Sequence, residues 1–227
     1  MKSKMTILVI LFVGLLLGIS CSKKAQAQSG AGRASPASDF SYDLSTDGKG
    51  IKITGYTGNG GRVVIPSIIE DMPVVEIKGV MGTPMQGAFQ GRAANKSQYF
   101  PANNITEIII PSSVIAIGDG ALSFNDNLIK VTLPNGIKVL ARGVFKDCGK
   151  LTSVNLPTEL EEIDMYAFEN CGELNNLIIS DSIRSIKFIE GNPGAGNNFA
   201  FRGCGKLPIK TRQTILDLGY KSELNVF

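Results

Sequence analysis

Cys148, Cys171 and Cys204 are the side chains of this sequence with the widest choice of chemistry, and a glycine follows each of them. A thiolate can attack an electrophile, bind a metal ion or form a disulfide. The chain has no histidine, however, and so lacks the commonest general base and the commonest metal ligand. Cys-Gly-Lys-Leu and Cys-Gly-Glu-Leu also lack metal-ligand spacing. We therefore predict no metal ion, no cofactor and no enzymatic activity, with catalysis by carboxylates or lysine as a distant alternative.

The three cysteines share one phase with Asn125, because each of the four residues stands three positions before a leucine. Equal phase in a repeating chain places such residues in one column, with one residue per repeat. Identical positions in stacked repeats project their side chains in parallel, which is poor geometry for a disulfide. We predict a buried ladder of small residues that bond the turn backbone, with three free thiols and Asn125 as the polar variant.

A period of 23 residues positions this column, because Pro111, Pro134 and Pro157 are separated by that interval and Ser180 follows at the next step. The same apolar frame precedes each of them: Ile105-x-x-Ile108-x-Ile110, Leu128-x-x-Val131-x-Leu133, Leu151-x-x-Val154-x-Leu156 and Leu174-x-x-Leu177-x-Ile179. Alternate residues of a strand face the same way, so each frame has one thin apolar edge. One repeat cannot bury that edge alone, but stacked repeats join the edges into a continuous core.

This period with an L-x-x-L-x-L core is the signature of a leucine-rich repeat. A degenerate earlier copy begins at Val63. The predicted fold class is a β-rich leucine-rich-repeat solenoid of about five 23-residue repeats over residues 60–207.

The N-terminal segment is predicted to be an export signal over residues 1–20. Lys2 and Lys4 precede an apolar stretch that is too short to cross a bilayer comfortably. The following Gly-Ile-Ser-Cys resembles a bacterial lipobox and makes Cys21 the predicted lipidation site, which would anchor the protein to a membrane, at the outer membrane surface. Cleavage after Ala27 is the alternative and would discard Cys21. Either route exports the protein.

Three further segments flank the repeats. Residues 21–38 contain no bulky apolar residue and are predicted to be a flexible tether, or else filler without a spacer role. Residues 39–59 alternate apolar and polar side chains around an Asp-Gly step, which predicts an N-terminal β-hairpin cap. Residues 208–227 are predicted to form a C-terminal cap with a short helix over 211–219, whose Ile215 and Leu218 would cover the last open repeat.

The stretch from Val154 to Cys171 resembles the BspA-type leucine-rich repeat of bacterial surface proteins, since it keeps the order of strand, proline, isoleucine, Ala-Phe and cysteine. Leu122 in place of phenylalanine and Ser180 in place of proline depart from that order. The resemblance covers roughly residues 60–207. It implies a right-handed solenoid on the cell surface that adheres to host matrix proteins, host cells or other bacteria, and it supplies no catalytic residue.

The strand positions that point away from the core form the candidate binding face. They are mostly charged or hydrogen-bonding: Arg62, Glu107, Ile109, Lys130, Thr132, Ser153, Asn155 and Asn176. Such side chains can hydrogen-bond a protein or a glycan, and the charges alternate in sign as suits neighbouring strands. A merely solvated sheet face is the alternative. Insertions near 78–104 and 190–199 either belong to a binding face or are tolerated loop length.

Charge excludes one class of partner. Without residues 1–20 the chain holds 21 basic and 20 acidic residues, so nothing predicts the strongly basic face that nucleic acid requires. The favoured function is a lipid-anchored surface module that binds a protein partner, such as a host matrix or cell-surface protein. A structural envelope protein that faces the periplasm, without external ligand, is the alternative.

Overall fold

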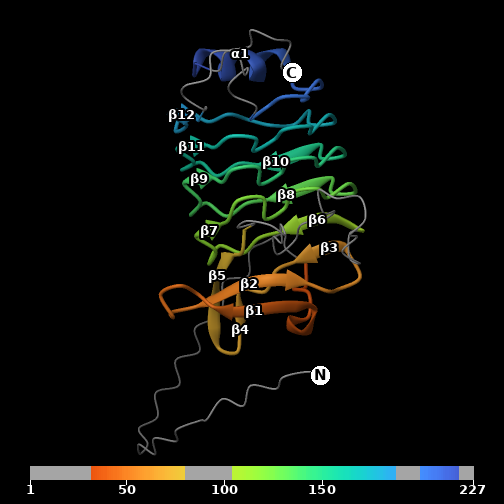
Figure 1. Cartoon of the computed structure of the whole chain (residues 1–227), viewed down its shortest axis with the longest axis vertical. Helices are drawn as coiled ribbons and strands as arrows, with labels where there is room; N and C mark the ends of the chain where they lie inside the picture. The colour runs from red at the N-terminus through yellow and green to blue at the C-terminus, as the bar shows by residue number, and fades with distance from the viewer. Residues whose placement is uncertain (1–31, 80–103, 188–199, 220–227) are drawn as a thin grey trace, which may run out of the picture. The chain divides into compact units, whose positions relative to one another are not determined.

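The computed structural model describes residues 32–79, 104–187 and 200–219. These residues form short strands, a 3-10 turn η1 (Ala37–Asp39) and one α-helix, α1 (Ile209–Asp217). Each clean repeat runs from a strand through a tight turn to a second short strand and then into a broad turn. Successive repeats lie one above another (Figure 1). This is the stacked, β-rich arrangement that the 23-residue period predicts.

The strands that precede the prolines form one parallel sheet. Its order is β3 (Gly61–Val64), β6 (Ile105–Ile109), β8 (Lys130–Thr132) and β10 (Ser153–Asn155). A bridge between Ser153 and Asn176 extends it by one more repeat. The inward positions are all buried: Val63, Ile108, Val131, Val154 and Leu177. Successive residues of a strand point to opposite faces of the sheet, so the residues between these inward positions point toward solvent.

The short strands that follow the prolines form the second side of the stack. β7 (Ala116–Ile117) pairs in parallel with β5 (Met72–Ile77). β9 (Val139–Leu140), β11 (Glu162–Ile163) and β12 (Ser185–Ile186) pair in parallel with one another. The turn between the two sides is the same in every clean repeat, because the carbonyl of Pro111 accepts from Val114 N at 3.1 Å and that of Ser180 from Ile183 N at 3.2 Å.

The predicted N-terminal hairpin is present. β1 (Phe40–Leu44) and β2 (Ile51–Tyr56) pair antiparallel, and β2 also pairs in parallel with β5. In the connecting turn Gly48 has a φ of 70°, and the Ser45 hydroxyl accepts a hydrogen bond from Gly50 N at 3.0 Å. The hairpin thus continues the second side of the stack.

The first repeat departs from the others between its two sides. β4 (Ile68–Ile69) pairs antiparallel with β5 through a turn at Glu70 and Asp71, whose φ angles are 49° and 61°. Two left-handed residues are the mark of a tight type I′ hairpin turn. This hairpin replaces the two-residue strand of the clean repeats, which is why the copy that begins at Val63 is degenerate.

The broad turns form the third side of the stack. Their N–H groups donate to carbonyls of the next repeat, as from Phe145 N to Ala167 O at 2.9 Å and from Phe168 N to Ala200 O at 2.7 Å. Beneath them, Phe145, Phe168 and Phe201 are fully buried and stack in sequence with ring centroids 5.3 Å apart at both steps. Burial of one such side chain stabilises a protein by roughly 1.5–3 kcal/mol, so packing within this column contributes strongly to the stability of the stacked repeats.

The open edge of β3 is covered by the segment before η1. Ile65 N donates toward β6, so the backbone groups of Val64 face the other way. There Ser35 N donates to Val64 O at 2.9 Å, and Val64 N donates to Ser35 Oγ at 3.1 Å. An exposed strand edge is a template for unwanted pairing, and Ser35 blocks it. Ser35 therefore does not belong to a flexible tether as expected for 21–38; residues 21–31 lie outside the described residues.

Helix α1 covers the C-terminal end of the repeats. It begins two residues earlier than predicted, after Pro208. Ile215 is fully buried in the core and Leu218 packs against it, as predicted. The Thr211 hydroxyl donates to Leu177 O at 3.1 Å, which ties the helix to the backbone of the last described repeat of the parallel sheet.

Candidate interaction face

The strand face is the outward side of β3, β6, β8 and β10, continued by residues 175–178. Strand register places Arg62 opposite Glu107, Glu107 opposite Lys130, and Lys130 opposite Ser153, and Ser153 bridges to Asn176. The structure thus brings these five residues into one column, in the predicted order.

The charged side chains of this column are paired with one another. Glu107 Oε2 lies 3.0 Å from Arg62 Nε, and Glu107 Oε1 lies 3.5 Å from Lys130 Nζ. All three side chains are partly exposed, and ion pairs of this kind stabilise by about 0.2–1 kcal/mol each. One carboxylate therefore serves two basic groups, and the alternation of sign is explained by pairing within the sheet.

The uncharged part of the face is joined by hydrogen bonds between adjacent repeats. Asn176 Nδ2 donates to Ser153 Oγ at 3.2 Å, and Thr152 Oγ1 donates to Ile129 O at 3.1 Å. Asn155 and Asn175 are exposed. This part can offer amide and hydroxyl groups to a ligand without first breaking an ion pair.

In the outermost column of the face, one predicted binding residue is buried. Val64, Ile109, Thr132 and Asn155 lie opposite one another in that order, as the sequence predicts. Ile109, however, is only 8 % exposed, although it does not belong to the core cluster. It lies between the β-branched side chains of Val64 and Thr132, and side chains directly opposite in neighbouring strands cover one another. Ile109 is therefore not available to a partner on this face.

The predicted thiol ladder is present. The Sγ atoms of Cys148, Cys171 and Cys204 are free and buried. They lie 3.2, 3.1 and 3.1 Å from backbone carbonyls of the preceding repeat, those of Leu122, Phe145 and Phe168 respectively. Asn125 Nδ2 donates to Leu122 O at 2.8 Å. Each member of the column thus bonds a turn carbonyl.

Burial also makes these thiols chemically inert. It raises the pKa of the Cys148 and Cys204 thiols to about 12, and it raises the pKa of Cys171 well above its ordinary value. The thiolate is the form of cysteine that attacks electrophiles and binds metal ions, so a thiol that stays protonated does neither. Within residues 32–79, 104–187 and 200–219, no group of three His, Cys, Asp or Glu side chains could hold a metal ion.

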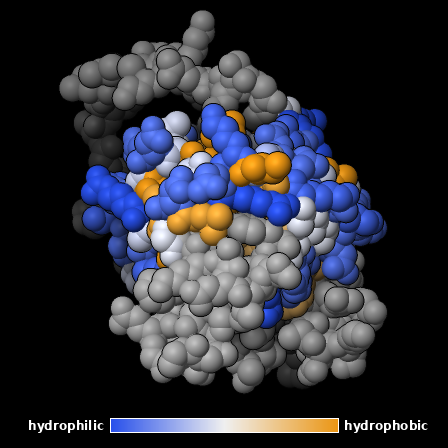
Figure 2. Space-filling view, turned by 90° about the horizontal axis from the view of Figure 1, so that it is seen from above, coloured by the Kyte–Doolittle hydropathy of each residue, from blue (hydrophilic) through white to orange (hydrophobic). Residues whose placement is uncertain are grey.

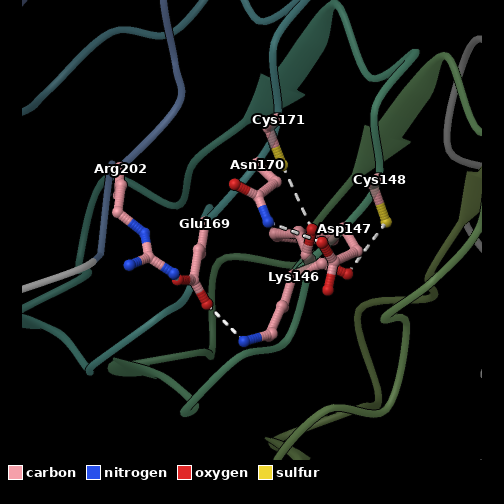
Figure 3. A network of polar contacts seen from close by, with 8 residues as sticks. Lys146, Asp147, Cys148, Glu169, Asn170, Cys171 and Arg202 are labelled. Carbon is pink, nitrogen blue, oxygen red and sulfur yellow. Dashed lines mark hydrogen bonds and ion pairs between the residues drawn. The ribbon is translucent and has the colours of Figure 1, made fainter. Parts of the chain in front are cut away.

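An ion-pair cluster around the buried Glu169 was not predicted from the sequence. Glu169 is 0 % exposed, and its two carboxylate oxygens are held by Lys146 and Arg202 from the repeats on either side (Figure 3). Beside it, Asn170 Nδ2 donates to Asp147 Oδ1 at 2.7 Å. The available signal was phase, because Lys146, Glu169 and Arg202 each follow the phenylalanine of the stacked column. The cluster joins three successive repeats through one buried carboxylate.

Two exposed isoleucines lie at the C-terminal end of the described repeats. Ile178 continues the outermost column, where strand alternation turns it outward, and is 78 % exposed. Ile209, the first residue of α1, was not among the candidate residues and is 86 % exposed. Ile209 stands two positions after Leu207, the spacing that separates Asn176 from Leu174, so phase could have found it.

Several predicted features lie outside the described residues. These are the lipidation site Cys21, the export signal, and most of both insertions. In the part of the chain that the structure describes, no helix is long and apolar enough to cross a membrane.

The repeats are similar to those of known leucine-rich repeat proteins. Residues 95–189 match the family model of the BspA type leucine rich repeat region, in 6 copies. A leucine rich repeat protein of T. pallidum is 26 % identical, with a TM-score of 0.57 over 83 % of this chain and 97 % of that one. A leucine-rich repeat protein from Bacteroides ovatus is also 26 % identical, with a TM-score of 0.51 over 74 % of this chain and 44 % of that one. No curated protein matches the chain.

Proposed function

We propose, on the premise that residues 95–189 are a BspA-type leucine-rich repeat region, that this protein is an exported, lipid-anchored surface module that binds a partner protein through its strand face. Leucine-rich repeats are protein-interaction modules, and stacked repeats create extended surfaces of this kind. The proposed role is adhesion to a host matrix protein or to a protein on a host or neighbouring cell.

The observation that carries the proposal is the unequal variation of the two sides of one sheet. Inward positions keep an apolar residue in every repeat, whereas the outward column changes from Arg62 through Glu107 and Lys130 to Ser153 and Asn176. The core needs none of these outward side chains, yet strand register holds them at fixed spacing. Polar groups held at fixed spacing can supply the direct hydrogen bonds that a protein–protein interface contains.

The anchor rests on the N-terminal sequence. Cleavage before Cys21 and acylation of its thiol would tether the repeats to a membrane. Intact-mass analysis of detergent-extracted protein tests this step. We expect a chain that begins at Cys21 and carries acyl groups, and a Cys21→Ser variant that leaves the membrane fraction. A chain that begins at Gln28 without lipid would make the protein a freely secreted one.

Adhesion of intact bacteria tests the binding role. Cells that express the wild-type protein should adhere to an immobilised matrix or host-cell protein and lose adhesion after external protease treatment. Asn176→Arg places a bulky charge on the strand face and should reduce adhesion about tenfold, the effect of losing roughly 1.4 kcal/mol of binding free energy. Thr158→Arg is the matched control, because Thr158 is exposed in the turn after Pro157 and lies off the strand face.

One pair of results would support the alternative role. If the protein on intact cells resists protease, and adhesion is the same with and without the gene, the chain is an envelope protein that faces the periplasm.

A further inference from the structure

We propose that the binding part of the strand face is its C-terminal half, and that this half takes an uncharged segment of a partner protein that presents apolar side chains. The C-terminal half consists of Ser153, Asn155, Asn175, Asn176, Ile178 and Ile209. The inference rests on the proposed function and narrows it to one end of the face and one chemistry of partner.

The N-terminal half of the face is already occupied by the protein itself. Glu107 pairs with both Arg62 and Lys130. Gly32 lies directly against Arg62, since a Cβ added there would meet Arg62 Nη1 at 2.5 Å. Ser35 holds the backbone of Val64, and Val64 and Ile109 are both buried. A partner at this end would have to displace the chain's own segment or break ion pairs.

The C-terminal half differs in every one of these respects. None of its six residues is charged. Its polar groups are exposed or bridged by the hydrogen bond between Asn176 and Ser153. Ile178 and Ile209 are the two most exposed large apolar residues among the described residues, at 78 % and 86 %. The bond from Thr211 to Leu177 holds the first turn of α1 beside the backbone next to Ile178. Seen from this end, the molecule shows hydrophobic side chains among hydrophilic ones (Figure 2).

The charge of this half selects the partner's chemistry. A charged group buried against uncharged side chains loses its water and gains no opposite charge, which costs several kcal/mol. Amide and hydroxyl groups, by contrast, exchange hydrogen bonds with water for hydrogen bonds with a partner backbone at little cost. Ile178 and Ile209 gain free energy only when apolar surface covers them. A glycan, whose surface is mostly hydroxyl, would leave that contribution unused.

Charged side chains lie at the border of this half and not within it. Lys206 Nζ lies 2.6 Å from Glu173 Oε2, just before the strand positions of their repeats. Lys130 stands opposite Ser153, and Lys210 follows Ile209 and is exposed. An apolar centre surrounded by polar and charged groups is the common anatomy of a protein–protein interface.

Selection of random peptides displayed on phage against the purified mature protein tests the inference without a known partner. We expect enrichment of peptides that lack charged residues and carry apolar ones, and a binding constant that changes by less than about twofold between low and high salt. Ile178→Ser should weaken the best peptide about tenfold. Ile115→Ser is the matched control, because Ile115 is 65 % exposed on the second side of the stack, and it should change binding by less than about twofold.

Each other outcome overturns the inference. Enrichment of charged peptides, equal effects of Ile178→Ser and Ile115→Ser, no enrichment, or binding of oligosaccharides instead of peptides would each do so. The adhesion experiment separates this failure from failure of the proposed function. If Asn176→Arg still reduces adhesion about tenfold while the selected peptides are charged, the face binds a partner but not of this chemistry.

Discussion

The inward and outward sides of the same repeats obey different rules. Inward, the column of Phe145, Phe168 and Phe201 keeps its residue type and stacks ring on ring. Outward, strand register aligns residues of opposite charge or of unrelated chemistry, such as Glu107 beside Lys130. Within the clean repeats from Ile105 to Lys187, both sides have the same 23-residue period and the same backbone, so backbone geometry cannot be the cause of the difference.

The cause is the surroundings of each column. An inward side chain touches its equivalents above and below, and interiors are packed at crystal density, so only a residue of matching size fits. An outward side chain touches water on one side and tolerates change. Glu169 stands between these cases, because it is buried like a core residue yet belongs to a column that varies as the outer ones do.

Truncation of the central ring of the stack should have the largest effect. Phe168→Ala removes the contacts to both Phe145 and Phe201 and leaves a cavity, so we expect a loss of about 3–5 kcal/mol in the free energy of unfolding. Asn155→Ala, on the outward side, should change it by no more than about 0.5 kcal/mol. Urea denaturation of both variants makes the comparison, and similar losses would show that the two sides are not distinct.

Neutralisation of the buried carboxylate should come next. Glu169→Gln leaves Lys146 and Arg202 without their counter-charge, and because both bases are partly exposed we expect a loss of about 2–3 kcal/mol. Glu107→Gln is the matched control, since Glu107 also serves two bases but on the outer face, and it should cost less than about 1 kcal/mol. Equal losses in denaturant titrations would remove the distinction between the two clusters.

The thiol ladder should make stability depend on alkaline pH. Burial raises the pKa of Cys148 from 9.0 to about 12, so in the unfolded chain the thiol ionises first. Between these values the folded state binds more protons than the unfolded state, and stability therefore falls as pH rises. By pH 10 this thiol should cost about 1.4 kcal/mol.

Cys148→Ala provides the control for that measurement. The variant loses the bond to Leu122 O and is less stable at pH 8, but its stability should fall less steeply than that of the wild type between pH 8 and pH 10. Parallel slopes in pH-dependent denaturation would mean that the thiol is already ionised, or accessible, in the folded protein.

Removal of one outward charge should have the smallest effect. Lys130→Gln leaves Glu107 paired with Arg62, so we expect a change of less than about 0.5 kcal/mol that disappears at high salt. Thermal unfolding at low and high ionic strength measures it. A larger, salt-independent loss would assign the outer column a structural role equal to that of the inner ones.

The sequence predicted the repeats well because period, phase and strand alternation are local properties. The position of Ser180 in the proline turn, the thiol ladder with Asn125, and the column from Arg62 to Asn176 all follow from counting residues. Residue spacing did not predict exposure or order where the contacts do not follow the 23-residue period. Ile109 is buried although its position in the repeat predicts that it points outward. Ser35 bonds the backbone of Val64 although the composition of residues 21–38 predicts a tether.

Apolar residues that recur every 23 positions predict stacked repeats, because stacking is the arrangement that buries them all. The accessibility of the outward residues, by contrast, depends on the folded chain. Gly32 and Ser35 lie against β3, Glu169 is enclosed by bases from two other repeats, and Ile209, the first residue of α1, is exposed. The physical reason is that exposure depends on neighbours distant in the chain, which a repeat period does not encode.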